Sequence, residues 1–184
     1  MESSYLSSTI KQFEYYKSLG DKTINQLSFK ELQWHPNEAS NTVSVVIKHM
    51  VGNMLSRWTN FLNEDGEKTW RARDAEFQET YSSKEELLAA WENGWLCLFT
   101  AVKPLKPEDL ERIIYIRNQG HTVTEAINRQ LAHYCYHVGQ MVFLGKLLKG
   151  NNWQSLSIPK GKSATYNQEK FSKEKERKHF TDDL

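Results

Sequence analysis

Two histidines four residues apart, His133 and His137, are the first side chains in this sequence with a spacing suited to metal binding. In a helix, that spacing places both imidazoles on one face, roughly 40° apart. A third imidazole, His49, lies midway along another predicted helix, from which it could reach the same ion across a bundle. The spacing alone leaves two interpretations open, a metal site and a solvated pair of histidines.

The residues between the two histidines limit the kinds of metal site that the pair could form. A zinc-protease helix carries Glu directly after its first His as general base, and here that residue is Tyr134. Cys135 lies about 160–200° around the helix from each histidine, so we expect it to pack as a small hydrophobic residue. Cys97 lies in an apolar run and is expected to do the same. Neither cysteine is predicted to be a metal ligand or a nucleophile.

Polar side chains accompany the histidines along both helices. The apolar stripe of each helix is centred about 120–140° away from its histidine, so the histidines lie on an adjoining polar stripe. Two such stripes facing each other would line a cleft. We therefore predict four residues that contact substrate or orient the ligands: Asn53, Arg57, Arg129 and Gln140. For the two arginines, an internal salt bridge or a solvated position is an equally good interpretation.

Four amphipathic segments must position these residues. Apolar side chains recur at helical spacing over residues 6–27, 43–61, 88–102 and 127–148. Together they predict an all-α protein, a four-helix bundle. The loops between the last three helices are not tight turns, so an up-down-up-down order is not required.

Capping residues indicate where these helices begin and end. Thr42 (or the adjacent Asn41) is a suitable N-cap for the second helix, and Ser83 opens the third with a capping-box pattern. Thr124 is the predicted N-cap of the fourth helix, and Gly150 follows its last turn.

The segments outside the helices differ in character. Residues 64–81 form a long polar loop, typical of a lid or a docking surface, although a merely solvated loop is equally compatible. Residues 107–121 predict a short extended excursion or hairpin, with its turn at 118–120. We assign residues 1–160 to the bundle, and we expect the polar tail, 161–184, to be extended or mobile.

Composition excludes several classes of protein. The chain has 184 residues with 24 basic and 23 acidic side chains, a net charge of +1, which argues against a nucleic-acid partner. Two cysteines are too few for a secreted disulfide framework. The N-terminus lacks the features of a signal peptide, and no apolar run is long enough to span a membrane. A cytoplasmic location is the expectation.

Two segments resemble a known family. Val46–Trp58, which contains His49, and His121–Gln140, which contains the other two histidines, are similar to the second and fourth helices of DinB-like proteins, also called the YfiT-like superfamily. The loop around 65–77 and the segment 153–163 resemble a subgroup without assigned function. The likeness covers roughly residues 5–170.

The resemblance implies a four-helix bundle, usually a homodimer, that holds one divalent metal on His49, His133 and His137. Three neutral imidazoles leave a coordination position open, as in catalytic zinc sites, and they suit Zn²⁺ or Ni²⁺. Characterised relatives transfer low-molecular-weight thiols such as bacillithiol, or are mycothiol-dependent isomerases. We therefore expect thiol S-transfer to an electrophile through a metal-bound thiolate, with Arg57 and Arg129 holding carboxylates of the thiol. Hydrolysis by metal-bound water and a non-catalytic stress-response dimer are the alternatives.

Overall fold

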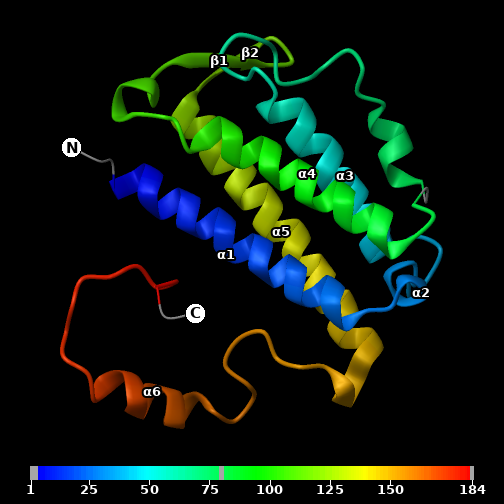
Figure 1. The fold of residues 1–184 in the computed structure, drawn as a ribbon, viewed down its shortest axis with the longest axis vertical. Helices are drawn as coiled ribbons and strands as arrows, with labels where there is room; N and C mark the ends of the chain where they lie inside the picture. The colour runs from blue at the N-terminus through cyan, green and yellow to red at the C-terminus, as the bar shows by residue number, and fades with distance from the viewer. Residues whose placement is uncertain (1–3, 79–80, 183–184) are drawn as a thin grey trace.

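The computed structural model describes residues 4–78 and 81–182, and four long helices dominate them (Figure 1). They are α1 (Ser4–Gln26), α3 (Val43–Trp58), α4 (Lys84–Val102) and α5 (Val123–Lys149). The prediction of an all-α helical bundle is confirmed. No helix within these described residues is long and apolar enough to cross a membrane.

The helices of the bundle run in parallel pairs. In Figure 1, α1 and α5 run away from the end that carries the strands, whereas α3 and α4 run towards it. The most extensive contacts join α3 to α4 and α1 to α5. Because α3 and α4 are neighbours with the same direction, the chain that joins them must return along the length of α3.

Aromatic side chains fill the centre of the bundle. Trp91, Trp95, Tyr134 and Phe13 are all fully buried, and each comes from a stripe that the helical periodicity predicts. The Tyr134 hydroxyl accepts a hydrogen bond from Nε1 of Trp58 at 3.1 Å, so the polar end of this buried ring is satisfied. The core therefore fixes the rotation of α5 relative to α3.

The helix starts agree with the predicted caps at α3 and α4 but not at α5. Thr42 caps α3 and Ser83 caps α4, each through its side-chain oxygen. The N-cap of α5 is Thr122, so the prediction of Thr124 is wrong by two residues. Thr122 forms a capping box with Glu125, whereas the Thr124 hydroxyl donates to the carbonyl of Leu110.

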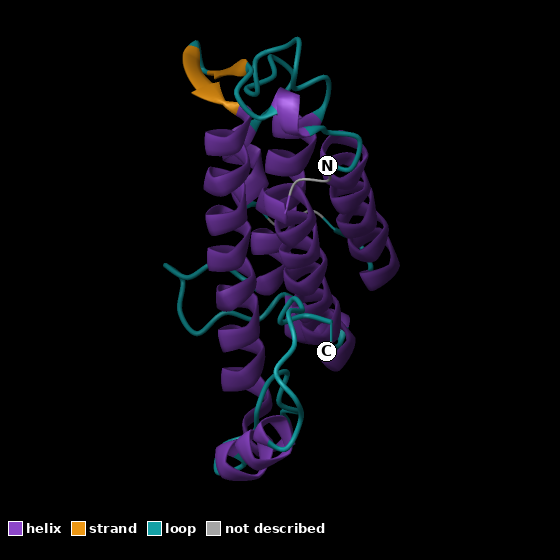
Figure 2. Ribbon diagram, turned by 90° about the vertical axis from the view of Figure 1, so that its left-hand side faces the viewer, coloured by secondary structure: helices purple, strands orange, loops and turns teal. Residues whose placement is uncertain are grey.

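The predicted excursion before the last long helix is an antiparallel hairpin at one end of the bundle (Figure 2). Its strands are β1 (Ile113–Ile116) and β2 (Gln119–Thr122). The turn residues are Arg117 and Asn118, which both have positive φ, so the turn begins one residue earlier than predicted. The carboxylate of Asp65 accepts the backbone N–H groups of both turn residues.

Short helices complete the described chain. They are α2 (Phe29–Leu32), η1 (Arg73–Phe77), η2 (Pro107–Asp109), η3 (Gly150–Asn152) and α6 (Ser163–Phe171). The expectation that the tail is extended is wrong over α6. The end of the tail also returns to α1, where Phe180 packs on Tyr15 and Asp182 pairs with Lys11. The predicted boundary at residue 160 stays a prediction.

Candidate metal centre

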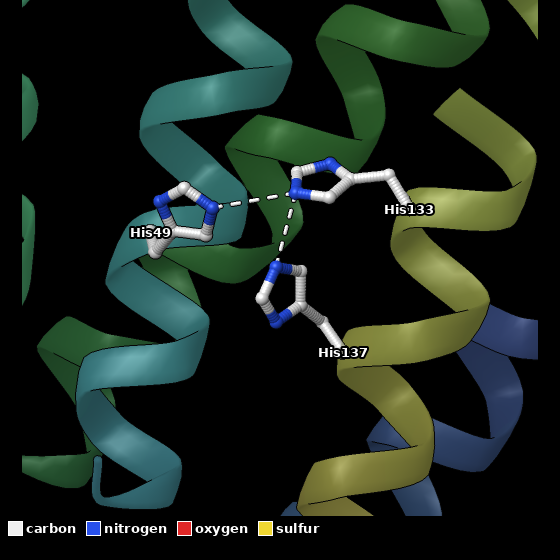
Figure 3. Close-up of side chains that lie close together, drawn as sticks. All are labelled: His49, His133 and His137. Atoms are coloured by element: carbon white, nitrogen blue, oxygen red, sulfur yellow. Dashed lines mark hydrogen bonds between the residues drawn. The ribbon is translucent and has the colours of Figure 1, made fainter. Parts of the chain in front are cut away.

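Three histidines converge between α3 and α5 (Figure 3). Nε2 of His133 lies 3.0 Å from Nε2 of His137 and 3.4 Å from Nε2 of His49. His49 is buried, and the other two are half-buried. The two helices thus bring together the three residues that the sequence analysis singled out, although 84 residues separate His49 from His133.

The spacing of the three nitrogens fits a single ion. Zinc binds imidazole nitrogen at about 2.0–2.1 Å, so the nitrogens of a tetrahedral site are separated by about 3.3 Å. The two distances given above bracket that value, and all the ligand atoms lie within 4.8 Å of one another. The donor set, three imidazole nitrogens, suits a divalent transition metal.

The outward-facing nitrogens of two histidines have partners of the kind that metal-ligating histidines use. Nδ1 of His49 donates to Oε2 of Glu76 at 2.9 Å, and Nδ1 of His137 donates to Oε1 of Gln140 at 2.8 Å. A proton held on Nδ1 leaves the lone pair of Nε2 free for an ion. Glu76 and Gln140 therefore orient two of the three candidate ligands.

Glu76 is the site residue that sequence reasoning missed. It lies in η1, inside the loop 64–81, and this segment runs back along α3 as the parallel helix pair requires. Arg71 donates to both oxygens of Glu76, at 2.7 and 2.9 Å, and the Glu76 residue is 6% exposed. Phe77 stacks on the imidazole of His49 with ring centroids 5.0 Å apart. Two features of the sequence could have pointed to a role for this loop in the site, namely its unusual length and its run of charged residues.

Ion pairs hold the described part of this loop against the bundle. Oε2 of Glu67 lies 2.9 Å from Nη1 of Arg57 on α3 and 3.3 Å from Nη1 of Arg71 in the loop. Nζ of Lys48 donates to the carbonyls of Ala75 and Gln78. The segment is therefore an ordered part of the site, and residues 79–80 of the predicted loop lie outside the described residues.

A glycine on α3 makes room for the carboxylate of Glu76. A Cβ atom built on Gly52 would overlap Oε1 of Glu76. Real Cβ atoms do not approach an oxygen this closely, so any larger residue at position 52 must displace the carboxylate. Gly52 is one turn from His49, and it lets the loop pack directly on the helix backbone.

The electrostatics of the group favour neutral imidazoles. Burial, followed by the proximity of His137 and His49, lowers the pKa of His133 to about 3. Burial also lowers the pKa of His137, against the opposing effect of Gln140. Burial opposes ionisation of Glu76, but hydrogen bonds from His49 and Arg71 outweigh it and lower the pKa of this carboxyl. At neutral pH, His133 and His137 can therefore offer lone pairs beside an ionised Glu76.

The four predicted supporting residues have different surroundings. Gln140 contacts His137, as already described, whereas Oδ1 of Asn53 accepts a hydrogen bond from the Tyr134 hydroxyl at 3.0 Å. Arg57 is buried, donates to the carbonyl of Gly66 and pairs with Glu67, so it has the internal salt bridge that the sequence left open. Arg129 is exposed on α5. Within the described residues, neither Cys97 nor Cys135 belongs to the metal-compatible group.

The fold and the site define a helical bundle with a three-histidine group that could hold a metal ion. Residues 1–162 match the model of a family described as a protein of unknown function, DUF1572, and the chain belongs to this family. No curated protein and no solved structure matches the chain.

Proposed function

We propose that the protein is a metal-dependent enzyme that transfers a low-molecular-weight thiol, of the bacillithiol type, to a small electrophile. The observation that carries the proposal is the convergence of three Nε2 atoms on one point at the wall of a cleft. This cleft has a volume of about 420 Å³ and is lined by His49 and His133. A ligand in it would lie next to any ion that the three nitrogens hold.

The residues of the chain prepare the site in three ways. Glu76 and Gln140 fix two imidazoles with Nε2 turned inwards. Burial keeps His133 neutral at physiological pH. Phe77 covers one face of His49 and shields it from water. A divalent ion, zinc or nickel in our proposal, would favour the thiolate form of a bound thiol near neutral pH.

The chemical balance of the transfer is simple. The thiol loses its proton to solvent, and its sulfur forms a bond to an electrophilic carbon. The leaving group departs with the electron pair of the bond that breaks. No general base is needed for this sequence once the thiol is ionised.

The cleft favours thiol transfer over hydrolysis. Among the described residues that line it, none is Asp or Glu. Glu125, the one acidic residue near the start of the polar stripe of α5, is held in the capping box of Thr122. The carboxylate of Glu76 already accepts hydrogen bonds from His49 and Arg71. Hydrolysis with water as the nucleophile therefore lacks a free carboxylate base and is the second candidate.

The resemblance to DinB-like proteins supports three further proposals. The first proposal is that the chain belongs to that superfamily, the second that it forms a homodimer, and the third that it is located in the cytoplasm. Exposed apolar residues on α5, Tyr136, Phe143 and Leu147, follow helical spacing and are compatible with a dimer contact. Light scattering at micromolar concentration should give twice the chain mass, and a monomer would contradict the proposal of a homodimer.

The test of the enzymatic proposal is a conjugation assay with zinc- or nickel-loaded protein. The thiols are bacillithiol, mycothiol, glutathione, coenzyme A and cysteine, each offered an alkyl halide and an epoxide. Metal-dependent formation of a thioether is expected with at least one thiol. Absence of conjugation with every pair, or hydrolysis of an ester or amide instead, would overturn the proposal.

Variants of the same chain provide the controls. His49→Ala should abolish conjugation, because two imidazoles on one helix hold an ion poorly. Cys97→Ser and Cys135→Ser should leave the rate nearly unchanged, since neither thiol belongs to the three-histidine group. A large loss in either cysteine variant would point to a protein thiol as the nucleophile.

A further inference from the structure

The cleft beside the three histidines is lined by five arginines. They come from α3 (Arg57), the loop that follows it (Arg71 and Arg73), the hairpin turn (Arg117) and α5 (Arg129). Segments far apart in the sequence thus bring their guanidinium groups to one hollow. This concentration of positive charge contrasts with the whole chain, whose net charge is +1.

Carboxylates of the protein neutralise only part of this positive charge. Oε2 of Glu67 lies within 3.3 Å of guanidinium nitrogens of Arg57, Arg71 and Arg117, and Glu76 pairs with Arg71. Asp65 is a third nearby carboxylate, because it interacts with the charge of Arg57 and accepts the backbone N–H of Arg117. Three carboxylates therefore face five arginines, which leaves two positive charges uncompensated. An ion at the histidines would add to this excess.

Within the part of the chain that the structure describes, two of these arginines have no carboxylate partner. The side chain of Arg129 forms no hydrogen bond or ion pair with any residue in 4–78 or 81–182, although it lines the cleft. Arg73 lies over the ring of Phe77, with its guanidinium carbon 5.3 Å from the ring centroid. Both side chains are exposed, so they are free to move onto a ligand.

A buried donor in the cleft wall also lacks a partner. Arg57 is 7% exposed, and its Nε has no hydrogen-bond partner among the described residues. A buried N–H without an acceptor destabilises the folded protein. Because this Nε atom is itself buried, Arg57 would act on an anion in the cleft through its positive charge.

We propose that this cleft binds an anionic group of the substrate, a carboxylate or phosphate, through Arg129 and Arg73, with Arg57 behind them. The proposal rests on the proposed function and specifies its substrate: the transferred thiol carries a negative charge close to its sulfur. Arg129 precedes His133 by one helical turn, a rise of about 6 Å. In the proposed substrate, the anionic group and the thiol sulfur are therefore separated by only a few bonds. Guanidinium groups suit this role because they bind oxyanions through paired N–H donors.

The experiment compares three small thiols of similar size and different charge on cobalt-loaded protein. They are 3-mercaptopropionate, 2-mercaptoethanol and cysteamine, and the thiolate-to-cobalt absorption band reports the binding of each. We expect 3-mercaptopropionate to bind at least tenfold more tightly than 2-mercaptoethanol, and cysteamine to bind most weakly. Arg129→Gln should remove most of that preference without changing the cobalt content.

A matched variant separates the local effect from a general loss of charge. Arg112 is an exposed arginine that pairs with Asp109 and does not line the cleft. Arg112→Gln should retain the full preference. Competition by acetate or by inorganic phosphate then shows which oxyanion the cleft prefers. Equal affinity for all three thiols would overturn the anion site while leaving the proposed thiol transfer intact.

Failure of the proposed function has a different signature. If none of the three thiols produces the absorption band, the sulfur does not reach the metal. Acetate and phosphate are then titrated directly into metal-free protein and followed by NMR chemical shifts. Binding that Arg129→Gln weakens tenfold or more would support the anion site independently. No shift with either anion would refute it.

Discussion

Oε2 of Glu76 lies 2.9 Å from Nδ1 of His49, and both side chains are more than nine-tenths buried. The carboxylate belongs to a loop and the imidazole to a helix, so a segment outside the bundle orients a residue inside it. This contact is the same arrangement, a carboxylate behind a histidine, that raises the basicity of metal ligands in other proteins. It makes the loop part of the candidate metal centre.

Loss of the Glu76 charge should weaken metal binding. Glu76→Gln keeps the shape of the side chain but removes the charge that faces His49 and Arg71, and outer partners of this kind contribute about 10–100-fold to metal affinity. Competition with a chromophoric chelator would measure the change. Glu108→Gln, at an exposed position in η2, is the control and should bind as tightly as the wild type. Equal affinity in both variants would contradict the proposed role of Glu76.

Metal removal should lower the melting temperature without unfolding the chain. We expect one divalent ion per chain, and an ion at 100 times its Kd adds about 2.7 kcal/mol of stability. For a chain of this length that corresponds to a shift of about 5–10 °C. Calorimetry before and after chelation measures it, and circular dichroism should show an intact helical signal. His133→Ala and His137→Ala should lose most of the ion by elemental analysis; full retention in both would refute the site.

Two helical glycines provide a matched test of the packing behind His49. Gly52→Ala should displace Glu76, destabilise the fold by about 1–3 kcal/mol and weaken metal binding. A Cβ on Gly139 meets no described residue within 4 Å, so Gly139→Ala should stabilise α5 by about 0.5–1 kcal/mol. Urea titrations would give both values. A Gly52→Ala protein as stable as the wild type would show that Glu76 can move away without cost.

Stability at acidic pH should depend on Glu31, which links α2 to the end of α5. Its carboxylate accepts hydrogen bonds from the backbone N–H of Ser28 and from Nζ of Lys149, and these contacts lower its pKa to about 2. Because the pKa is lowered in the folded state, the stabilisation is complete above the ordinary value of 4.5 and is lost as the pH falls towards 2. Glu31→Gln should reduce the melting temperature by about 2–4 °C at pH 7. The difference should shrink steadily between pH 5 and pH 2.5.

A control makes the origin of that effect clear. Glu38 is an exposed carboxylate in the turn before α3. Glu38→Gln changes the net charge by the same amount and should leave the melting temperature within 1 °C at every pH, in keeping with the small effect of most surface substitutions. A difference between the Glu31 variant and the wild type that does not shrink in acid would mean that the charge of Glu31 is not the stabilising element.

The helices and the three histidines were accessible to sequence reasoning for a physical reason. Helical periodicity specifies which residues share a face, and a spacing of four places His133 and His137 together. Even Gln140 follows from this rule, because it lies one turn beyond His137 on the same face. Local capping was predicted less well: Thr124 was expected to cap the last long helix, but Thr122 does so, and the Thr124 hydroxyl makes a tertiary contact with the carbonyl of Leu110.

The residues that the sequence did not predict are those brought in by the long connection. Nothing in a spacing rule relates Glu76 to His49, because their contact depends on the path of residues 59–78 along α3. The neutralisation of Arg57 by Glu67 depends on the same path. A carboxylate in an irregular segment can reach any part of a bundle, so such contacts require the three-dimensional structure.

The separation of the ligands along the chain has a consequence for unfolding. His49 and His133 are 84 residues apart, so an ion bound to both closes a large loop and acts as a reversible cross-link. Helices α3 and α5 cannot part until at least one imidazole leaves the ion. A bound ion would therefore slow the unfolding of the loaded protein, and amide hydrogen exchange in the middle of both helices would measure how much.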